Sequence, residues 1–241
     1  MAQPEQVSYH GNPNLKPLAY QHDFTKEEIQ EYVKCKEDPK YFIENYVKIV
    51  TLDKGLQPFK LFDCQKGKVD LIMKERKVIL MEGRQQGKTV TAAACILHYT
   101  IFQEDKTVAI MANKASAARE VLNRYQIMYE NLPLWMQQGV RVWNKGDVEL
   151  ENNSKVLTAA TTAAAIRGKS VNWLFIDEAA IIPNNIADEF FTSVYPTISA
   201  GETTKILLTS TPLGYNHFWK FWNESEKGEN GFENMFIPYY E

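Results

Sequence analysis

Cysteine is scarce in this chain of 241 residues, and neither sign of charge dominates it. The three cysteines, Cys35, Cys64 and Cys95, are odd in number and far apart, which argues against a disulfide framework and a Cys-x-x-Cys metal site. Such cysteine usage is typical of a reducing compartment. The net charge of -3 and pI of about 5.9 lack the basic surplus of a protein that binds DNA tightly as a monomer.

Long apolar runs and repeats are also missing. No run approaches the roughly 20 residues of a membrane-spanning helix, so we expect no membrane partner. No charged segment followed by an apolar one opens the chain, so we expect no signal peptide. The composition, 44% hydrophobic and 24% charged, allows a sizeable core and favours a single domain with extensions.

A glycine-punctuated loop after a short apolar run is the most informative pattern present. Residues 77–81 predict a strand, and the alanine-rich segment 89–102 predicts a helix. Backbone N–H groups of such a loop hold the phosphates of a nucleotide triphosphate such as ATP, and its Lys and Thr reach the β- and γ-phosphates and Mg²⁺. The residues concerned are Gly83, Arg84, Gln85, Gln86, Gly87, Lys88 and Thr89.

Two departures weaken this pattern when it is taken alone. Glu82 stands where the usual motif has glycine, and Arg84 stands inside the loop. A chance match therefore remains an alternative at this point, and the assignment depends on a second motif.

That second motif is an acid pair after four apolar residues, 173–176. The pattern predicts a buried strand that delivers Asp177 and Glu178 at its carboxyl end, where ligands of open α/β sheets bind. Asp177 is the expected Mg²⁺ ligand, and Glu178 the general base that activates water. A solvated acid pair at the end of a strand is the ordinary alternative.

The order of predicted elements indicates an α/β fold with a mostly parallel, doubly wound sheet. The strand predicted at 107–112 lies between the two motifs, which resembles the additional-strand, catalytic-Glu branch of P-loop NTPases. We expect a disordered arm at 1–22 and one ATPase domain at 23–241. Its expected parts are a helical N-terminal extension at 23–58, a P-loop core at 59–211, and a C-terminal helix and strand at 212–241.

Three further groups of residues are candidates for the same site. Thr209, Ser210 and Thr211 follow a predicted strand and resemble a coupling motif that senses hydrolysis, although turn chemistry before a proline explains them equally well. Gln65 resembles an upstream adenine-binding Gln, and Phe59 is a candidate for stacking on the base. An exposed helical Gln is the alternative.

Arg167 lies eleven residues before Glu178, in a predicted loop. Its fixed charge and planar fork suit transition-state phosphoryl oxygens, either in its own subunit or in a neighbour. The alternative is a surface arginine in a loop.

Together these motifs resemble the ATPase domain of tailed-bacteriophage terminase large subunits, the DNA-packaging motors, and most closely the myovirus type. The resemblance covers roughly residues 25–240 and rests on five segments: 83–89, 142–146, 166–170, 175–180 and 209–214. It implies roles for Arg84 in catalysis or coupling and for Arg167 as a finger acting in trans. Family members carry a C-terminal nuclease domain; this sequence stops at Glu241, so we expect no nuclease activity from it.

The resemblance further implies a motor module that hydrolyses ATP and moves double-stranded viral DNA into a procapsid. Its implied partners are the portal protein, the small terminase subunit and other copies in a ring. The implied location is the host cytoplasm, at the portal during assembly and not in the mature virion. Two alternatives remain: a helicase-like ATPase that remodels nucleic acid, which would need a second motor domain, and a non-catalytic, ATP-gated assembly subunit.

Overall fold

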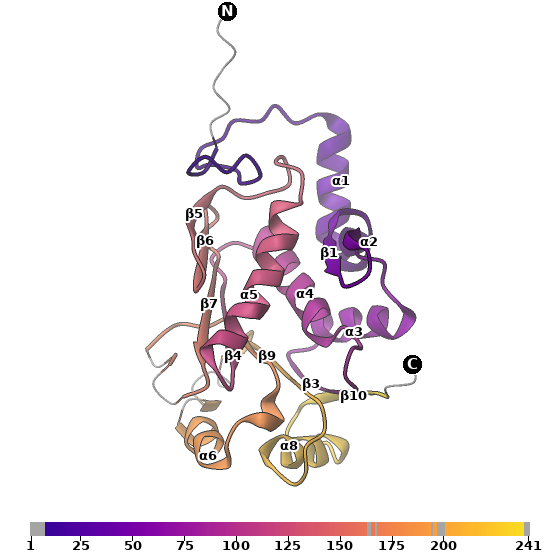
Figure 1. The fold of residues 1–241 in the computed structure, drawn as a ribbon, viewed down its shortest axis with the longest axis vertical. Helices are drawn as coiled ribbons and strands as arrows, with labels where there is room; N and C mark the ends of the chain where they lie inside the picture. The colour runs from indigo at the N-terminus through magenta and orange to yellow at the C-terminus, as the bar shows by residue number, and fades with distance from the viewer. Residues whose placement is uncertain (1–7, 163–164, 167, 194, 197–200, 239–241) are drawn as a thin grey trace, which may run out of the picture.

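The computed structural model describes residues 8–162, 165–166, 168–193, 195–196 and 201–238. Within them, one eight-stranded sheet has the order β10-β3-β9-β8-β4-β7-β6-β5 (Figure 1). The strands from β10 to β7 run parallel, while β6 and β5 are antiparallel. Their bounds are β3 Lys77–Glu82, β4 Thr107–Ala112, β5 Val140–Trp143, β6 Asp147–Leu150, β7 Lys155–Ala160, β8 Trp173–Ile176, β9 Lys205–Ser210 and β10 Glu233–Ile237.

Helices cover both faces of this sheet, and its central strands are therefore buried on both sides. In β3, Val78 and Leu80 pack against one helical layer and Ile79 against the other. The first layer contains α1 Lys26–Glu37, α2 Pro39–Tyr46, α3 Asp63–Lys74, α4 Lys88–Phe102 and α5 Ala115–Glu130. The second contains the 3₁₀ helix η1 Ala179–Ile181, α6 Asn184–Ser193 and α8 His217–Glu226. This is the doubly wound, mostly parallel α/β fold that the sequence predicts.

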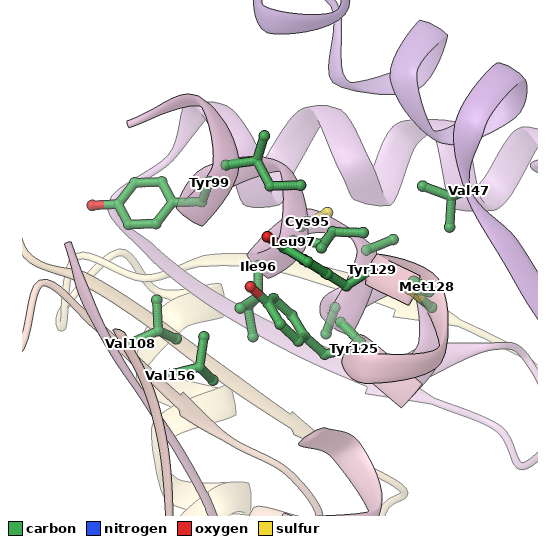
Figure 2. Packing of buried hydrophobic residues seen from close by; sticks show 14 of the residues in the cluster. Val47, Cys95, Ile96, Leu97, Tyr99, Val108, Tyr125, Met128, Tyr129 and Val156 are labelled. Atoms are coloured by element: carbon green, nitrogen blue, oxygen red, sulfur yellow. The ribbon is translucent and has the colours of Figure 1, made fainter. Parts of the chain in front are cut away.

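The packing of α4 against α5 forms the centre of the first layer (Figure 2). Tyr125 and Tyr129 project from α5 and stack with ring centroids 6.2 Å apart. Both rings are fully buried, beside Cys95 and Ile96 of α4. Aromatic side chains of this size contribute much of the apolar area that a core buries. The two helices therefore hold a fixed relative position.

The N-terminal extension is only partly helical. The capping box of α1 forms as predicted, with Thr25 and Glu28 bonded to each other's backbone N–H groups. Within the segment 23–58, which we expected to be helical, the structure also has an antiparallel hairpin of β1 Lys48–Thr51 and β2 Gly55–Pro58. The sequence conceals this hairpin because each strand has only four residues and neither has a buried one.

Residues 8–22 differ from the arm that we expected at 1–22. Leu15 is buried in the core, and the backbone N–H of Val140 donates to the Lys16 carbonyl (2.9 Å). Gln137 accepts from the Lys16 N–H (3.0 Å) through its side chain. This part of the segment is therefore packed on the domain, while residues 1–7 lie outside the described residues.

All three cysteines are free thiols. Burial raises the pKa of both Cys35 and Cys95 to about 12, so each stays a neutral thiol and a poor nucleophile. Across the described ranges, none of the helices combines the length and the hydrophobicity that crossing a bilayer requires.

Buried His98 makes a testable contribution to stability. Its Nε2 contacts the carbonyl of Cys35 (2.9 Å), and burial lowers its pKa from 6.5 to about 4. The folded protein thus keeps His98 neutral where the unfolded chain takes up a proton, so this contribution is full above pH 6.5 and is lost as the pH falls towards 4. Between pH 7 and pH 5 we expect His98 to account for a loss of about 2 kcal/mol.

Denaturant unfolding of a His98→Leu variant at pH 7 and pH 5 measures this contribution of His98 to the free energy of unfolding. The difference in unfolding free energy between pH 7 and pH 5 should shrink by about 2 kcal/mol relative to wild type. His10→Leu, at an exposed histidine, is the control and should keep the wild-type difference. An unchanged pH dependence in His98→Leu would contradict the assignment.

Candidate functional site

The glycine-punctuated loop connects β3 to the start of α4. Gly87 is the N-cap of α4 and has a left-handed backbone (φ 72°), which glycine adopts without strain. A Cβ at this position would also collide with the side-chain amide of Gln65. The loop is anchored to the end of β10, since the Gly83 N–H donates to the Ile237 carbonyl (3.0 Å). The free N–H groups at the N-terminus of α4 form a site suited to anions.

The acid pair lies at the carboxyl end of β8, directly beside this loop. The Thr89 hydroxyl donates to Asp177 Oδ2 (2.9 Å), and Lys88 Nζ donates to Glu178 Oε1 (2.5 Å). Asp177 is only 7% exposed, whereas the Glu178 side chain is 35% exposed. The two motifs that the sequence places 88 to 90 residues apart thus meet in one site.

The end of β9 contacts the same two acids. Thr209 donates to Asp177 Oδ1 (2.8 Å), and the Ser210 hydroxyl donates to Glu178 Oε2 (3.4 Å). Ser210 also accepts from the backbone N–H of Ala180 (3.1 Å). These bonds tie two of the three predicted coupling residues, Thr209 and Ser210, to the two carboxylates, while Thr211 lines the pocket described below.

Glu178 has an unusual backbone conformation. Its φ of 51° and ψ of 46° place it in the left-handed region, just before the 3₁₀ helix η1. For a residue with a side chain this conformation costs on the order of 1–3 kcal/mol and is concentrated at functional sites. It turns the chain sharply after Asp177, so the two carboxylates face different partners.

A pocket of about 250 Å³ opens over the loop. We call it the phosphate pocket, and its lining consists of Gly83, Arg84, Gln85, Gly87, Lys88, Thr89, Val90, Arg124, Glu178 and Thr211. The lining brings three cationic side chains, one carboxylate and the helix N-terminus together. Such a combination suits a polyphosphate anion.

The donor set also fits a magnesium ion. Octahedral Mg²⁺ holds oxygen ligands at about 2.0–2.1 Å, which places neighbouring ligands about 2.9 Å apart. The Thr89 hydroxyl and Asp177 Oδ2 have that separation, 2.9 Å. The described residues contain no cluster of three or more His, Cys, Asp and Glu side chains, but Mg²⁺ at nucleotide sites needs few protein ligands because phosphates and water supply the rest.

Comparison with known protein families shows to which family this chain belongs. The family described as terminase large subunit, T4likevirus-type, N-terminal, matches residues 79–235, well over half of the chain. This chain belongs to that family. The matched range contains the glycine-punctuated loop, the acid pair and the end of β9. The resemblance to terminase large subunits that these motifs indicated is therefore confirmed.

Solved structures of phage terminases share the fold. The large terminase of bacteriophage HK97 is 18% identical with a TM-score of 0.66, over 85% of this chain and 43% of that protein. The large terminase ATPase domain of Thermus phage P74-26 is 19% identical with a TM-score of 0.59, over 74% of this chain and 81% of that one. A large terminase from a thermophilic bacteriophage in complex with ADP is 12% identical, with a TM-score of 0.57, and the match covers 73% and 45% of the two chains. This terminase domain therefore spans less than half of the HK97 protein.

Other predicted site residues lie elsewhere. Gln65 is buried behind the loop, where its amide donates to the Gln86 carbonyl (3.4 Å) and accepts from the Phe62 N–H (3.1 Å). Phe59 is buried in the core among the helices of the first layer. In this conformation both side chains have structural contacts, and their adenine-binding roles stay predictions. Arg167 lies outside the described residues.

Sequence reasoning missed a buried ion pair beneath the loop. Lys68 of α3 and Glu82 are both fully buried and bonded to each other, and Lys68 Nζ also donates to the Gln86 carbonyl (3.4 Å). Burial raises the pKa of Glu82, an effect that the Lys68 ammonium opposes. The signal in the sequence was Glu82 itself, which replaces a loop glycine and extends β3 by one residue beyond the predicted strand.

Proposed function

We propose that this terminase domain binds ATP and Mg²⁺ in the phosphate pocket and hydrolyses ATP to drive DNA packaging. The observation that carries the proposal is the meeting of Lys88 and Thr89 with Asp177 and Glu178 at one helix N-terminus. Family membership supports packaging as the purpose of the hydrolysis. Hydrolysis itself requires a base, and Glu178 stands at the pocket wall with its carboxylate partly exposed.

Each residue has a distinct part in this proposal. Lys88 and the loop N–H groups bind the phosphates, and Thr89 and Asp177 would hold Mg²⁺. When bound, the ion would supply positive charge that neutralises the phosphate oxygens. Glu178 takes the proton of the attacking water. For it to do so, Lys88 must exchange its bond to Glu178 for one to phosphate, which frees the carboxylate.

Coupling to movement is assigned to Thr209, Ser210 and Thr211. Thr209 shares Asp177 with Thr89, so a change at the metal site reaches the end of β9 through one carboxylate. Beyond β9 the chain continues into α8, and Asn216 donates to the Ala180 carbonyl (3.0 Å). We assign to Arg84 and Arg167 the stabilisation of transition-state charge, with Arg167 acting in its own subunit or in a neighbour's site.

Double-stranded DNA, the portal protein, the small terminase subunit and other copies in a ring are the proposed partners. The proposed setting is the host cytoplasm at the procapsid portal. Among the alternatives, a helicase-like ATPase would be stimulated by nucleic acid without a portal, and an ATP-gated subunit would bind ATP without turnover. Measuring ATPase activity with and without portal protein and DNA distinguishes the packaging motor from these two alternatives.

Binding is tested by replacing Lys88. We expect Lys88→Ala to weaken Mg·ATP binding about 10- to 100-fold, because bonds to a charged group contribute about 1.5–3 kcal/mol. Calorimetric titration measures the change. Lys220→Ala, at an exposed lysine of α8, serves as the control and should bind like wild type. Unchanged affinity in Lys88→Ala would rule out the phosphate pocket as the nucleotide site.

A further inference from the structure

One cation of the phosphate pocket comes from outside the loop. Arg124 lies on α5, yet it lines the pocket together with the loop residues, Glu178 and Thr211. It also lines a neighbouring groove of about 300 Å³ between α5 and the β1–β2 hairpin, and Val90 belongs to both linings. Arg124 therefore stands where the two hollows join, at the rim of the proposed nucleotide site.

The helix that carries Arg124 is held rigidly against α4. Tyr125, the next residue, is fully buried, and its hydroxyl is within hydrogen-bond distance of Thr100 Oγ1 of α4 (3.0 Å). Figure 2 shows this ring inserted between α5 and α4. Because α4 begins at Lys88, the packing of the two helices fixes the position of Arg124 relative to the phosphate loop. Groups carried by a rigid helix are held more precisely than groups on a loop.

Arg124 has no bonding partner among the residues that the structure describes. Glu120 lies one turn earlier on the same helix, the spacing at which opposite charges commonly pair. No ion pair joins the two, and no hydrogen bond to another described residue is present. Lys88 already neutralises the one carboxylate in the pocket lining, Glu178. Arg84 and Arg124 then give the pocket lining an excess of positive charge.

We propose that Arg124 is a nucleotide ligand that binds a phosphate oxygen from α5, within the same subunit. The inference rests on the proposed ATPase function and adds a contact outside the loop. A guanidinium presents a planar fork that matches phosphate oxygens and keeps its charge at all accessible pH values. Since α5 is fixed against α4, Arg124 meets the phosphate equally in the bound state and in the transition state. Such uniform binding acts on affinity and KM, not on kcat.

The test compares Arg124→Ala and Arg124→Gln with wild type in titrations with Mg·ATP, Mg·ADP and AMP. We expect about 10- to 100-fold weaker ATP binding, a kcat at saturation within about twofold of wild type, and no change for AMP. Arg124→Lys should recover part of the affinity, because it restores the charge without the fork. The melting temperature without nucleotide should stay unchanged in all three variants, since Arg124 is exposed.

Arg119→Ala is the matched control, at an exposed arginine of α5 outside the pocket lining, and should bind ATP like wild type. Normal ATP affinity in Arg124→Ala, in a protein where Lys88→Ala weakens binding, would overturn the Arg124 inference and leave the proposed function intact. A loss of kcat at unchanged affinity would overturn it as well. A wild-type protein that binds no ATP would remove both proposals together.

Discussion

In a Glu178→Gln variant we expect single-turnover ATP hydrolysis to fall about 10²- to 10⁴-fold while ATP binding is retained. Glutamine keeps the size of the side chain and cannot accept the proton of the attacking water. It also removes the negative charge that pairs with Lys88, so the lysine becomes freer to bind phosphate. Affinity for Mg·ATP should therefore be equal to wild type or higher.

Quenched-flow hydrolysis with excess enzyme, together with calorimetric binding, separates the two effects. Glu229→Gln, at an exposed acid beyond α8, is the control and should hydrolyse ATP like wild type. If Glu178→Gln turns over at the wild-type rate, another group is the base. If it fails to bind ATP, the carboxylate has a role in binding instead.

The second large effect concerns stability. Lys68→Met should lower the free energy of unfolding by about 3–5 kcal/mol, because it strands the Glu82 carboxylate in the interior without a counter-charge. The other carboxylate oxygen, Oε1, already lacks a hydrogen-bond partner among the described residues, so Glu82 has no substitute donor. The double variant Lys68→Met with Glu82→Leu should recover most of the loss, since apolar replacement of a buried ion pair is often neutral or stabilising.

Urea unfolding of the two variants measures the difference. Lys66→Met lies on the same helix with a side chain 42% exposed, and we expect it to change stability by less than about 0.5 kcal/mol. A double variant no more stable than Lys68→Met would show that the pair has a further role, such as holding the Gln86 carbonyl through Lys68. ATP affinity of the double variant tests that role directly.

Much of the architecture was accessible from the sequence because its signals are local. The apolar runs before Gly83 and before Asp177 indicate strands that are buried on both faces. The lysine and threonine of the loop mark the start of helix α4. Parallel strands align their carboxyl ends, so two distant motifs were expected to meet. The capping box at Thr25 was equally visible, since both of its partners lie within one turn.

What escaped prediction depends on contacts between distant segments. Glu82 stands out in the sequence only as a departure from the loop motif, and nothing there links it to Lys68, because only the folded chain buries the two side chains together. Arg124 stands on the polar side of an amphipathic helix, where a solvated arginine is the common case. Helix α6 was missed, and Gln65 was predicted at an adenine although it lies against the Gln86 carbonyl in the structure.

The pairing of β10 with β3 has a mechanical consequence. Strand β10 runs parallel to β3 over five register pairs and ends beside the loop, where Ile237 accepts from Gly83 and Pro238 accepts from the Gln86 side chain (3.3 Å). Tension applied to the chain just beyond residue 238 would load the evenly spaced bonds of this parallel pair in shear, all at once, rather than unzip them one by one. The strand would resist the tension as a unit and transmit it to the loop that precedes Lys88. Tension on the chain beyond β10 would in this way change the position of the loop and, with it, the affinity of the pocket for a nucleotide.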